Sequence, residues 1–258
     1  MLLSIVIPAY NEEKRIGASL HELQAFLPNH FEQTEVIVVN DGSSDRTSDV
    51  VEFFVKPSGM HRLMLVELTQ NSGKGAAVKT GVERASGDVI LFMDADLSTP
   101  LSEISKVLLP LQQGKDIAIG SRATKDSNIL ERQPFYRESM GKMFNLLVRL
   151  LVINGISDTQ CGFKAFRREA AKEIFKRLNT VRFGFDVEVL LWAKVLGYSV
   201  EEVGVTWINS PHSRVSPIRD SLEMLWSLFR IRRQVYASFK QASKNRNLNV
   251  KYGESSLR

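Results

Sequence analysis

The chain has 258 residues and is 43% hydrophobic, which suits one large globular α/β domain with or without an appendage. No signal peptide is visible, because residues 1–6 lead directly into a predicted strand, and no apolar run reaches the roughly 20 residues of a spanning helix. Cys161 is the only cysteine, so an intrachain disulfide is excluded, and the four histidines lack the spacing of a zinc site. We therefore expect a cytoplasmic protein.

The positive charge is concentrated at the end of the chain. Residues 214–258 contain ten Lys and Arg against three Asp and Glu, a net charge of +7, which leaves −2 for residues 1–213. Basic segments bind nucleic acid or anionic lipid headgroups, or are simply solvated. Because apolar residues stand beside this segment, we expect a membrane surface and no nucleic acid as its partner.

The first predicted strand covers residues 2–7, and apolar residues at helical spacing predict a helix over 12–27. The loop Pro8–Glu12 between them lies at the carboxyl end of a strand, where open α/β sheets bind ligands. Tyr10 could lie against a nucleotide base there, and Glu12 could contact a ribose or a base edge. Taken alone, such a loop is more often an ordinary strand-to-helix turn.

The second unit repeats this arrangement. A buried strand is predicted at 36–39 and a helix at 46–55, and Asp41 between them could bond a uracil or a ribose. A third strand at 63–68 leads to Gly73-Lys74-Gly75, a glycine-rich loop that suggests a phosphate cradle made by helix N-terminal N–H groups. The loop is not a Walker A motif, and no G-x-G-x-x-G follows the first strand, which argues against nicotinamide or flavin binding.

The fourth predicted strand, residues 89–93, ends in two acids. Asp94 and Asp96 stand two positions apart, so in an extended chain they face the same side. Hard carboxylate oxygens suit Mg²⁺ or Mn²⁺ that carries a diphosphate. The alternative is a turn or a helix cap, because the residues that follow also form a good helix start.

A helix over 101–113 and a fifth strand over 116–120 complete this half of the chain. Together the motifs resemble glycosyltransferase family 2, whose members have the GT-A fold. The motifs that carry this resemblance are Pro8-Ala9-Tyr10-Asn11-Glu12, Asn40-Asp41-Gly42-Ser43, Gly73-Lys74-Gly75, Asp94-Ala95-Asp96 and Gly120-Ser121-Arg122.

The second half resembles the dolichyl-phosphate β-glucosyltransferase group of that family, and less closely the dolichyl-phosphate mannose synthases. This resemblance rests on three stretches: Asp158-Thr159-Gln160-Cys161-Gly162-Phe163-Lys164, Phe185-Asp186-Val187-Glu188 and Ser213-Arg214-Val215. The mannose synthases carry Gln where this chain has Ser98, which departs from the mannosyl pattern. UDP-glucose is our first choice of donor because residues 158–164 resemble the glucosyl branch, and GDP-mannose stays open.

The resemblance implies an α/β protein with a mostly parallel, Rossmann-like sheet and helices on both faces. We expect a GT-A domain over 1–213, divided into a nucleotide-sugar half, 1–122, and an acceptor half, 123–213. An amphipathic helix at the membrane interface would cover 214–239, followed by a flexible basic tail over 240–258.

Two apolar helices are candidates for membrane contact. Residues 142–153 are apolar nearly all round, and residues 222–233 combine Trp and Phe with a basic flank, but both are too short to span. Such helices can lie in the headgroup layer. The alternatives are packing against the sheet or a dimer contact.

The implied reaction transfers a sugar, with inversion, from a nucleotide diphosphate to a polyprenyl phosphate on the cytoplasmic side of a membrane. Asp94 and Asp96 would hold the metal, and Asp96 is also an implied catalytic residue. The candidates for steadying the acceptor phosphate, which is ionised already and needs no base, are Arg122, one or both of Arg132 and Arg137, and Arg214. The implied donor-binding set is Pro8, Tyr10, Glu12, Asp41, Lys74, Asp94, Ala95, Asp96, Asp158 and Gln160.

Two further hypotheses stay open. A hydroxyl-directed transferase would need a carboxylate base, which Asp158, Asp186 or Glu188 could supply. A peripheral membrane scaffold would keep the nucleotide fold without turnover.

Overall fold

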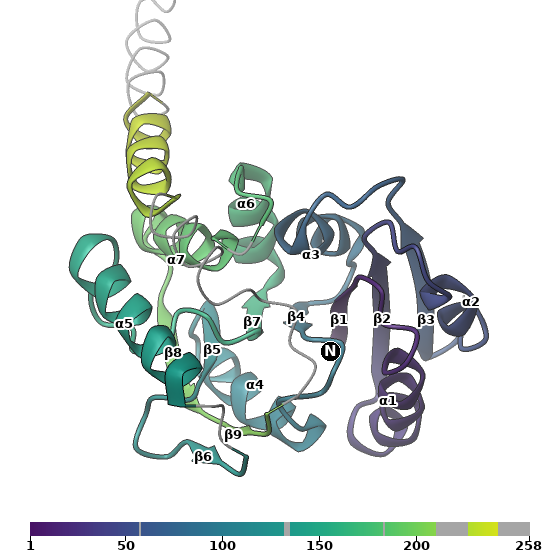
Figure 1. Cartoon of the computed structure of the whole chain (residues 1–258). Coiled ribbons are helices and arrows are strands. Elements are labelled where there is room, and N and C mark those ends of the chain that lie inside the picture. The colour runs from purple at the N-terminus through teal and green to yellow at the C-terminus, as the bar shows by residue number, and fades with distance from the viewer. Residues whose placement is uncertain (57, 132–134, 183, 210–226, 242–258) are drawn as a thin grey trace, which may run out of the picture.

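Figure 1 shows a computed structural model of the chain, which describes residues 1–56, 58–131, 135–182, 184–209 and 227–241, without the side chains of residues 136 and 137. The strands are β1 Leu2–Ala9, β2 Gln33–Asn40, β3 His61–Glu67, β4 Val89–Met93, β5 Ile117–Ser121, β6 Asn128–Ile129, β7 Phe163–Arg167, β8 Val200–Gly204 and β9 Thr206–Trp207. The helices are α1 Ile16–His30, α2 Thr47–Glu52, α3 Lys74–Arg84, the 3₁₀ turn η1 Leu101–Glu103, α4 Ile104–Gln112, α5 Phe135–Leu151, α6 Arg168–Arg177 and α7 Phe185–Leu196.

The central sheet has seven strands in the order β3-β2-β1-β4-β7-β5-β8, and β6 pairs with β9 in a separate two-stranded sheet. Strands β1 to β4 are mutually parallel and are joined by helices. All five residues of β4 are buried, as expected for an apolar strand that is covered on both faces. The predicted mostly parallel α/β sheet is confirmed.

Strand β7 is the exception to the parallel order, and the sequence analysis did not anticipate it. It runs antiparallel between β4 and β5, with Phe163 opposite Met93 and Lys164 opposite Ile119. Beyond it, β8 pairs in parallel with β5. Residues 1–122 and 123–213 therefore share one sheet, and their division into two functional halves stays a prediction.

Helices cover both faces of the sheet (Figure 1), and the two faces carry two apolar cores. Alternate residues of β1 point to opposite sides, as the period of a strand requires. Val6 joins the core formed with α3, α6 and α7, whereas Ile5 and Ile7 join the core formed with α1 and α4.

The two predicted membrane-interface helices also contribute to the first core. In α5, Phe144 and Val148 are buried in it, and in the helical segment 227–241 the buried residues include Leu228 and Ile231. Arg232 of that segment donates a hydrogen bond to the carbonyl of Leu151, which places the segment beside the end of α5. No helix in the described ranges has the length and apolarity that crossing a membrane requires.

Glu35 of β2 ties three elements together at the amino ends of the strands. Its carboxylate is fully buried and accepts hydrogen bonds from the Ser4 hydroxyl, the Ser86 N–H at 2.5 Å and the Gly87 N–H at 3.1 Å, and it pairs with Arg62. Burial alone would raise the pKa of Glu35, but these hydrogen bonds outweigh it and hold the pKa below its ordinary value of 4.5.

We predict that Glu35→Gln lowers the free energy of unfolding by about 1–3 kcal/mol at pH 7, because a charged acceptor of buried N–H groups is lost. Since the folded-state pKa is depressed, this contribution is complete above the unfolded pKa of about 4.5 and fades as the pH falls below it. Urea unfolding at pH 7 and at about pH 3.5 measures the difference.

The matched control is Glu32→Gln, since Glu32 is an exposed neighbour of β2. An equal loss of stability at both pH values would contradict the assigned charge effect.

Candidate active site

A cleft of about 380 Å³ opens at the carboxyl ends of β1, β2 and β4. Ligands of open α/β sheets bind at this edge. The predicted donor-binding residues that line the cleft are Pro8, Tyr10, Glu12, Asp41, Lys74, Asp94, Ala95 and Asp96. Its other lining residues are Ala9, Arg15, Asn71, Gly73, Ala77 and Arg182.

The two acids that follow β4 are each paired with a cation. Lys74 Nζ lies 2.6 Å from Asp94 Oδ1, and Arg15 lies 3.7 Å from Asp96 Oδ2 while also holding Glu12 at 2.6 Å. Burial opposes the charge of Lys74, but Asp94 outweighs it and raises the pKa of the amine. The Arg15 guanidinium likewise has a raised pKa, chiefly through its hydrogen bond to Glu12.

Asp96 also takes part in the turn after β4. Its Oδ1 accepts the Ser98 N–H at 3.1 Å, so the predicted turn-cap alternative is partly realised, while Oδ2 faces Arg15 and the carboxylate still lines the cleft. The intervening Leu97 has a φ of +50°, a left-handed conformation that non-glycine residues seldom adopt. Backbone strain of this kind is common at functional sites.

The donor set at this turn fits a divalent ion that the protein shares with its substrate. Asp94 and Asp96 offer hard carboxylate oxygens, and Mg²⁺ is commonly held by one or two carboxylates together with substrate phosphates. Over the described part of the chain, no three His, Cys, Asp or Glu side chains form a metal-binding group. Two acids suit an ion completed by a diphosphate rather than one enclosed by protein alone.

Asp41, the residue expected to meet uracil or ribose, lies in the cleft but also holds the next loop. Its two oxygens accept the backbone N–H groups of Ser72 at 2.7 Å and Gly73 at 2.8 Å. Burial raises the pKa of Asp41, and these two bonds oppose the shift. Asp41 therefore fixes the start of α3, and its contact with a nucleotide stays a prediction.

In the loop Gly73-Lys74-Gly75, which was expected to cradle a phosphate, the N–H groups of both glycines are bonded within the protein, and the predicted phosphate contact stays untested. Gly73 donates to Asp41, and Gly75 donates to the carbonyl of Val181 at 2.8 Å. A Cβ atom on Gly73 would lie 2.4 Å from the Val181 oxygen, and one on Gly75 would lie 2.6 Å from the Thr180 oxygen. These glycines make room for a chain segment of the second half rather than for a phosphate.

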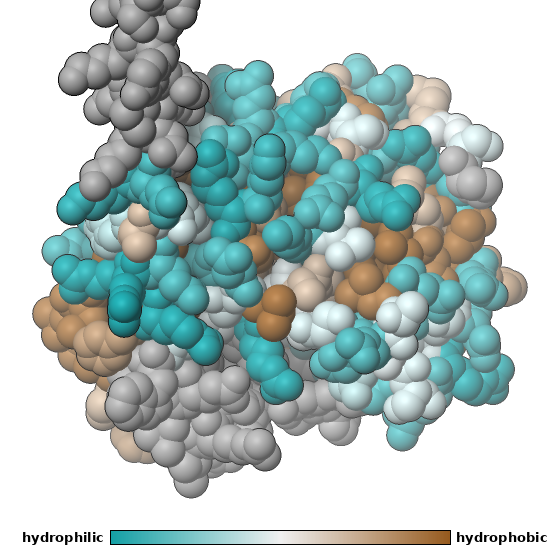
Figure 2. Space-filling view, turned by 90° about the horizontal axis from the view of Figure 1, so that it is seen from above, coloured by the Kyte–Doolittle hydropathy of each residue, from teal (hydrophilic) through white to brown (hydrophobic). Residues whose placement is uncertain are grey.

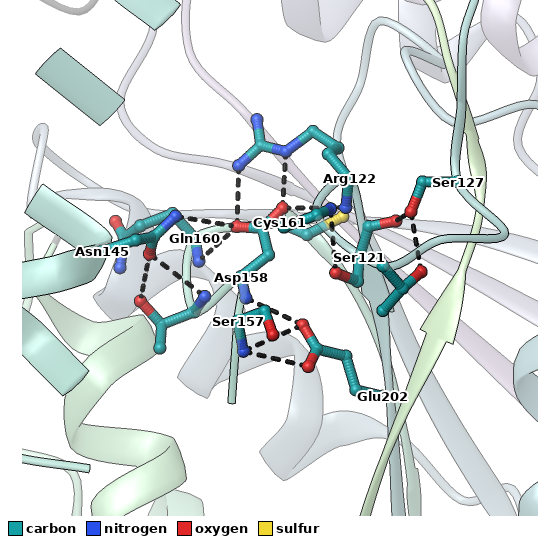
Figure 3. Close-up of polar contacts among 12 residues, drawn as sticks. Ser121, Arg122, Ser127, Asn145, Ser157, Asp158, Gln160, Cys161 and Glu202 are labelled. Atoms are coloured by element: carbon teal, nitrogen blue, oxygen red, sulfur yellow. Dashed lines mark hydrogen bonds and ion pairs between the residues drawn. The ribbon is translucent and has the colours of Figure 1, made fainter. Parts of the chain in front are cut away.

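A second polar cluster, shown in Figure 3, surrounds Arg122 and Asp158. Nε and Nη2 of Arg122 donate to the two Asp158 oxygens at 2.7 and 2.9 Å, and the guanidinium lies 5.5 Å from the ring centre of Trp207. Asp158 is buried, which would raise its pKa, but Arg122 lowers the pKa to about 2. Asp158 thus stays ionised and holds Arg122 in place.

Neighbouring side chains fix this cluster from three directions (Figure 3). Glu202 of β8 accepts the N–H groups of Ser157 and Asp158 at 2.9 and 2.8 Å, and Asn145 of α5 accepts the N–H and hydroxyl of Thr159. Gln160 donates its backbone N–H to Asp158 at 3.1 Å. Asp158 and Gln160, expected to bind the donor, therefore belong to a cluster that does not line the cleft described above, and their predicted role is untested.

The predicted acceptor arginines are only partly within the described ranges. Arg122 is placed as above, whereas Arg132 and Arg214 lie outside the described residues. Arg137 belongs to α5, but its side chain is not among those described. Contacts of Arg132, Arg137 and Arg214 with an acceptor stay predictions.

All three carboxylates named as possible general bases are buried and engaged. Asp158 is held by Arg122, and Asp186 forms an ion pair with Lys164 inside the protein. Glu188 accepts the backbone N–H groups of residues 179 and 180 at 3.0 and 2.7 Å. Each of them is thus already engaged in a structural contact within the protein.

Sequence analysis assigned no individual role to three charged residues that the fold brings to the site or close to it. Arg15 and Arg182 line the cleft, and Lys164 is fully buried between the Cys161 carbonyl at 2.6 Å and Asp186. A charged residue inside the apolar strand after Gly162 was the available signal for Lys164. No sequence signal distinguished Arg15 or Arg182 from surface cations.

The carboxylate of Asp94 lies in tight contact with Gly162. A Cβ atom on Gly162 would lie 2.2 Å from Asp94 Oδ2, so Gly162→Ala must displace that carboxylate. We expect the affinity for UDP in the presence of Mn²⁺ to fall about tenfold or more, because changes beside a metal ligand typically weaken metal binding by this amount. Isothermal titration calorimetry measures it, and circular dichroism verifies the fold.

Gly141→Ala is the matched control, because nothing lies within 4 Å of a Cβ atom there. Equal affinity of Gly162→Ala and the wild type would count against Asp94 as a ligand.

Comparison with known proteins agrees with this geometry. Residues 4–175 match the family model described as Glycosyl transferase family 2. The dolichyl-phosphate beta-glucosyltransferase of Drosophila melanogaster is 39% identical over 240 residues, which cover 89% of this chain and 74% of that protein. The Homo sapiens protein of the same name is 34% identical over 258 residues, covering 96% and 80%.

Solved structures resemble the chain in fold. The glucosyl-3-phosphoglycerate synthase of Mycobacterium tuberculosis, in complex with Mn²⁺, UDP-glucose and phosphoglyceric acid, gives a TM-score of 0.65 at 18% identity, covering 89% of this chain and 78% of that one. The predicted GT-A fold is thereby confirmed. From its family match and its relatives, the chain belongs to glycosyltransferase family 2, within the group of the dolichyl-phosphate β-glucosyltransferases.

Proposed function

We propose that this protein transfers glucose from UDP-glucose, with inversion, to the phosphate of a polyprenyl lipid such as dolichyl phosphate, and that the reaction depends on Mg²⁺ or Mn²⁺. The names of its relatives support the lipid phosphate acceptor and the glucosyl group. A structural neighbour was crystallised with UDP-glucose and Mn²⁺, which is consistent with this donor and with a divalent ion.

The proposal rests on the observation that the candidate carboxylates are already engaged in ion pairs or hydrogen bonds. In the described part of the chain, each acid in the cleft has a partner. Glu12 and Asp96 face Arg15, Asp94 pairs with Lys74, and Asp41 accepts backbone N–H groups. The possible bases outside the cleft are engaged as well. A hydroxyl acceptor would need a free base, whereas a phosphate monoester is ionised at neutral pH and needs none.

In this proposal, different residues of the cleft bind different parts of the donor. Tyr10 is 37% exposed and can lie against the uracil ring, with Asp41 and Glu12 nearby for polar contacts to the base or ribose. Lys74 can turn from Asp94 to the diphosphate, since its amine already lies in the cleft. A divalent ion bound by Asp94, Asp96 and the diphosphate would offset the charge that develops on the leaving group.

The acceptor would approach from the side of Arg122. Two of the guanidinium nitrogens of Arg122 are bound to Asp158, and its remaining nitrogen can donate to a phosphate oxygen. In our proposal Arg137 and Arg214 complete this group of cations. Attack from the face opposite the leaving group would give a β-linked product from an α-linked donor.

We predict transfer from UDP-glucose to a short polyprenyl phosphate in the presence of Mn²⁺, and its loss in Asp96→Asn. The variant loses a charged metal ligand but keeps the size of the side chain, so the fold is retained and the rate should fall by about 10³-fold or more. A radiolabelled-sugar assay with thermal unfolding of both proteins measures this.

Asp49→Asn in α2, far from the cleft lining, serves as the control. Transfer from GDP-mannose but not from UDP-glucose would show that the proposed donor is wrong. Transfer to polyprenol but not to polyprenyl phosphate would show that the proposed acceptor is wrong. Absence of both transfer and hydrolysis in the wild type would favour a scaffold.

A lipid substrate requires a membrane surface, and α5 offers an apolar stripe for it. Phe135, Met143, Leu146 and Leu150 are 84%, 63%, 51% and 70% exposed and lie along one side of this helix, away from its buried residues. Apolar atoms gather at the left edge of Figure 2, the side on which α5 lies in Figure 1. We infer peripheral attachment to the cytoplasmic face through this stripe.

The helical segment 227–241 also exposes apolar side chains. Phe229, Tyr236 and Phe239 are exposed, and Arg230 and Arg233 are exposed among them. Aromatic and basic residues together are typical of helices at the headgroup layer. Because this segment touches the end of α5, the two helices can contact one membrane surface.

We predict that the double variant Leu146→Gln and Leu150→Gln binds vesicles of phosphatidylcholine and phosphatidylserine about tenfold more weakly, since two exposed apolar side chains can no longer enter the bilayer. Vesicle sedimentation measures this partition, and thermal stability should not change because both residues are exposed.

Leu109→Gln is the matched control, a leucine of α4 that is 52% exposed on another helix. Binding of the double variant at the wild-type level would contradict attachment through α5.

A further inference from the structure

The segment 178–182, between α6 and α7, is held rigidly against the cleft. Glu188 of α7 is buried and accepts the N–H groups of Asn179 at 3.0 Å and Thr180 at 2.7 Å, and the indole N–H of Trp192 at 3.3 Å. A buried carboxylate that accepts several N–H groups anchors a loop strongly. Glu188 thus acts as a structural anchor for this segment.

The same segment closes the N-terminus of α3. The carbonyl of Val181 accepts the N–H groups of Gly75 at 2.8 Å and Ala76 at 3.3 Å. Free N–H groups at a helix start would otherwise attract a phosphate. Since these two N–H groups are satisfied within the protein, we expect most of the positive charge that a diphosphate needs in this cleft to come from side chains or from a metal ion.

Arg182 follows directly on Val181 and lines the cleft together with Lys74 and Asp94. Its Cγ atom would lie 3.2 Å from a Cβ atom on Gly73, so the side chain passes over the loop that was expected to hold the phosphates. Within the described ranges, its guanidinium makes no hydrogen bond or ion pair with the protein. The other two cations of the cleft, Arg15 and Lys74, are paired with acids.

We propose that Arg182 binds the diphosphate of the nucleotide donor, since Val181 already accepts two of the first N–H groups of α3. A guanidinium can donate two parallel hydrogen bonds to phosphate oxygens, which a lysine cannot. Arg182 shares its cleft with Tyr10 and Asp41, whereas Arg122, the cation assigned to the acceptor, belongs to the other cluster. The inference rests on the proposed function, which makes this cleft the donor site.

The test measures the binding of UDP and of GDP in the presence of Mn²⁺ by isothermal titration calorimetry. Arg182→Gln should weaken the preferred diphosphate about tenfold, and Arg182→Lys should weaken it less, because the charge remains without the fork. Lys176→Gln is the control, since Lys176 is an exposed cation of the adjoining helix that does not line the cleft. The KM for polyprenyl phosphate, at saturating donor, should change less than about threefold in Arg182→Gln.

The outcomes separate this inference from the proposed function. If the wild type prefers GDP and Arg182→Gln binds GDP about tenfold more weakly, the donor assignment would change, but the role of Arg182 in binding the diphosphate would be supported. Unchanged diphosphate affinity with a raised KM for the lipid phosphate would move Arg182 to the acceptor side and overturn the inference. An affinity within about twofold of the wild type, with no change in KM, would also overturn it. A wild type that binds neither nucleotide would overturn both.

Discussion

The antiparallel pairing of β7 with β4 is the constraint on which the site depends. Met93 and Phe163 are the last pair of this ladder, so Asp94 and Gly162 meet directly beyond it, close enough that any side chain at 162 would displace the carboxylate. The same strand carries Lys164 into the interior, where it binds Asp186 of α7. One strand from the second half therefore positions an acid of the first half and connects it to the helix that anchors segment 178–182.

Sequence alone was sufficient where structure is determined locally. Buried parallel strands appear as continuous apolar runs, and residues that follow such runs meet at one edge of the sheet. Tyr10, Asp41 and Asp94 were placed together for this reason, and all three line the cleft. The turn after β4 was also foreseeable in both of its roles, since Asp96 faces the cleft with one oxygen and accepts the Ser98 N–H with the other.

The remainder depends on contacts between distant parts of the chain. A glycine-rich loop looks the same whether a phosphate or another backbone fills the space beside it, and only the fold reveals Val181 against Gly75. The insertion of β7 between β4 and β5 has no local signal either. An acid such as Glu188 could equally be a base or an anchor, because its role is decided by which N–H groups it meets.

The pairing of charges in the cleft explains how one protein can bring two anions together. Asp94 is paired with Lys74 and Asp96 faces Arg15, so neither acid lacks a nearby cation. A divalent ion held by Asp94 and Asp96 would neutralise both acids, and Lys74 would then be able to bind the phosphates of the donor. Asp186, itself bound by Lys164, also attracts the Lys74 amine and contributes to its raised pKa. Because each acid keeps a positive partner, the cleft would not add unpaired negative charge to that of the donor.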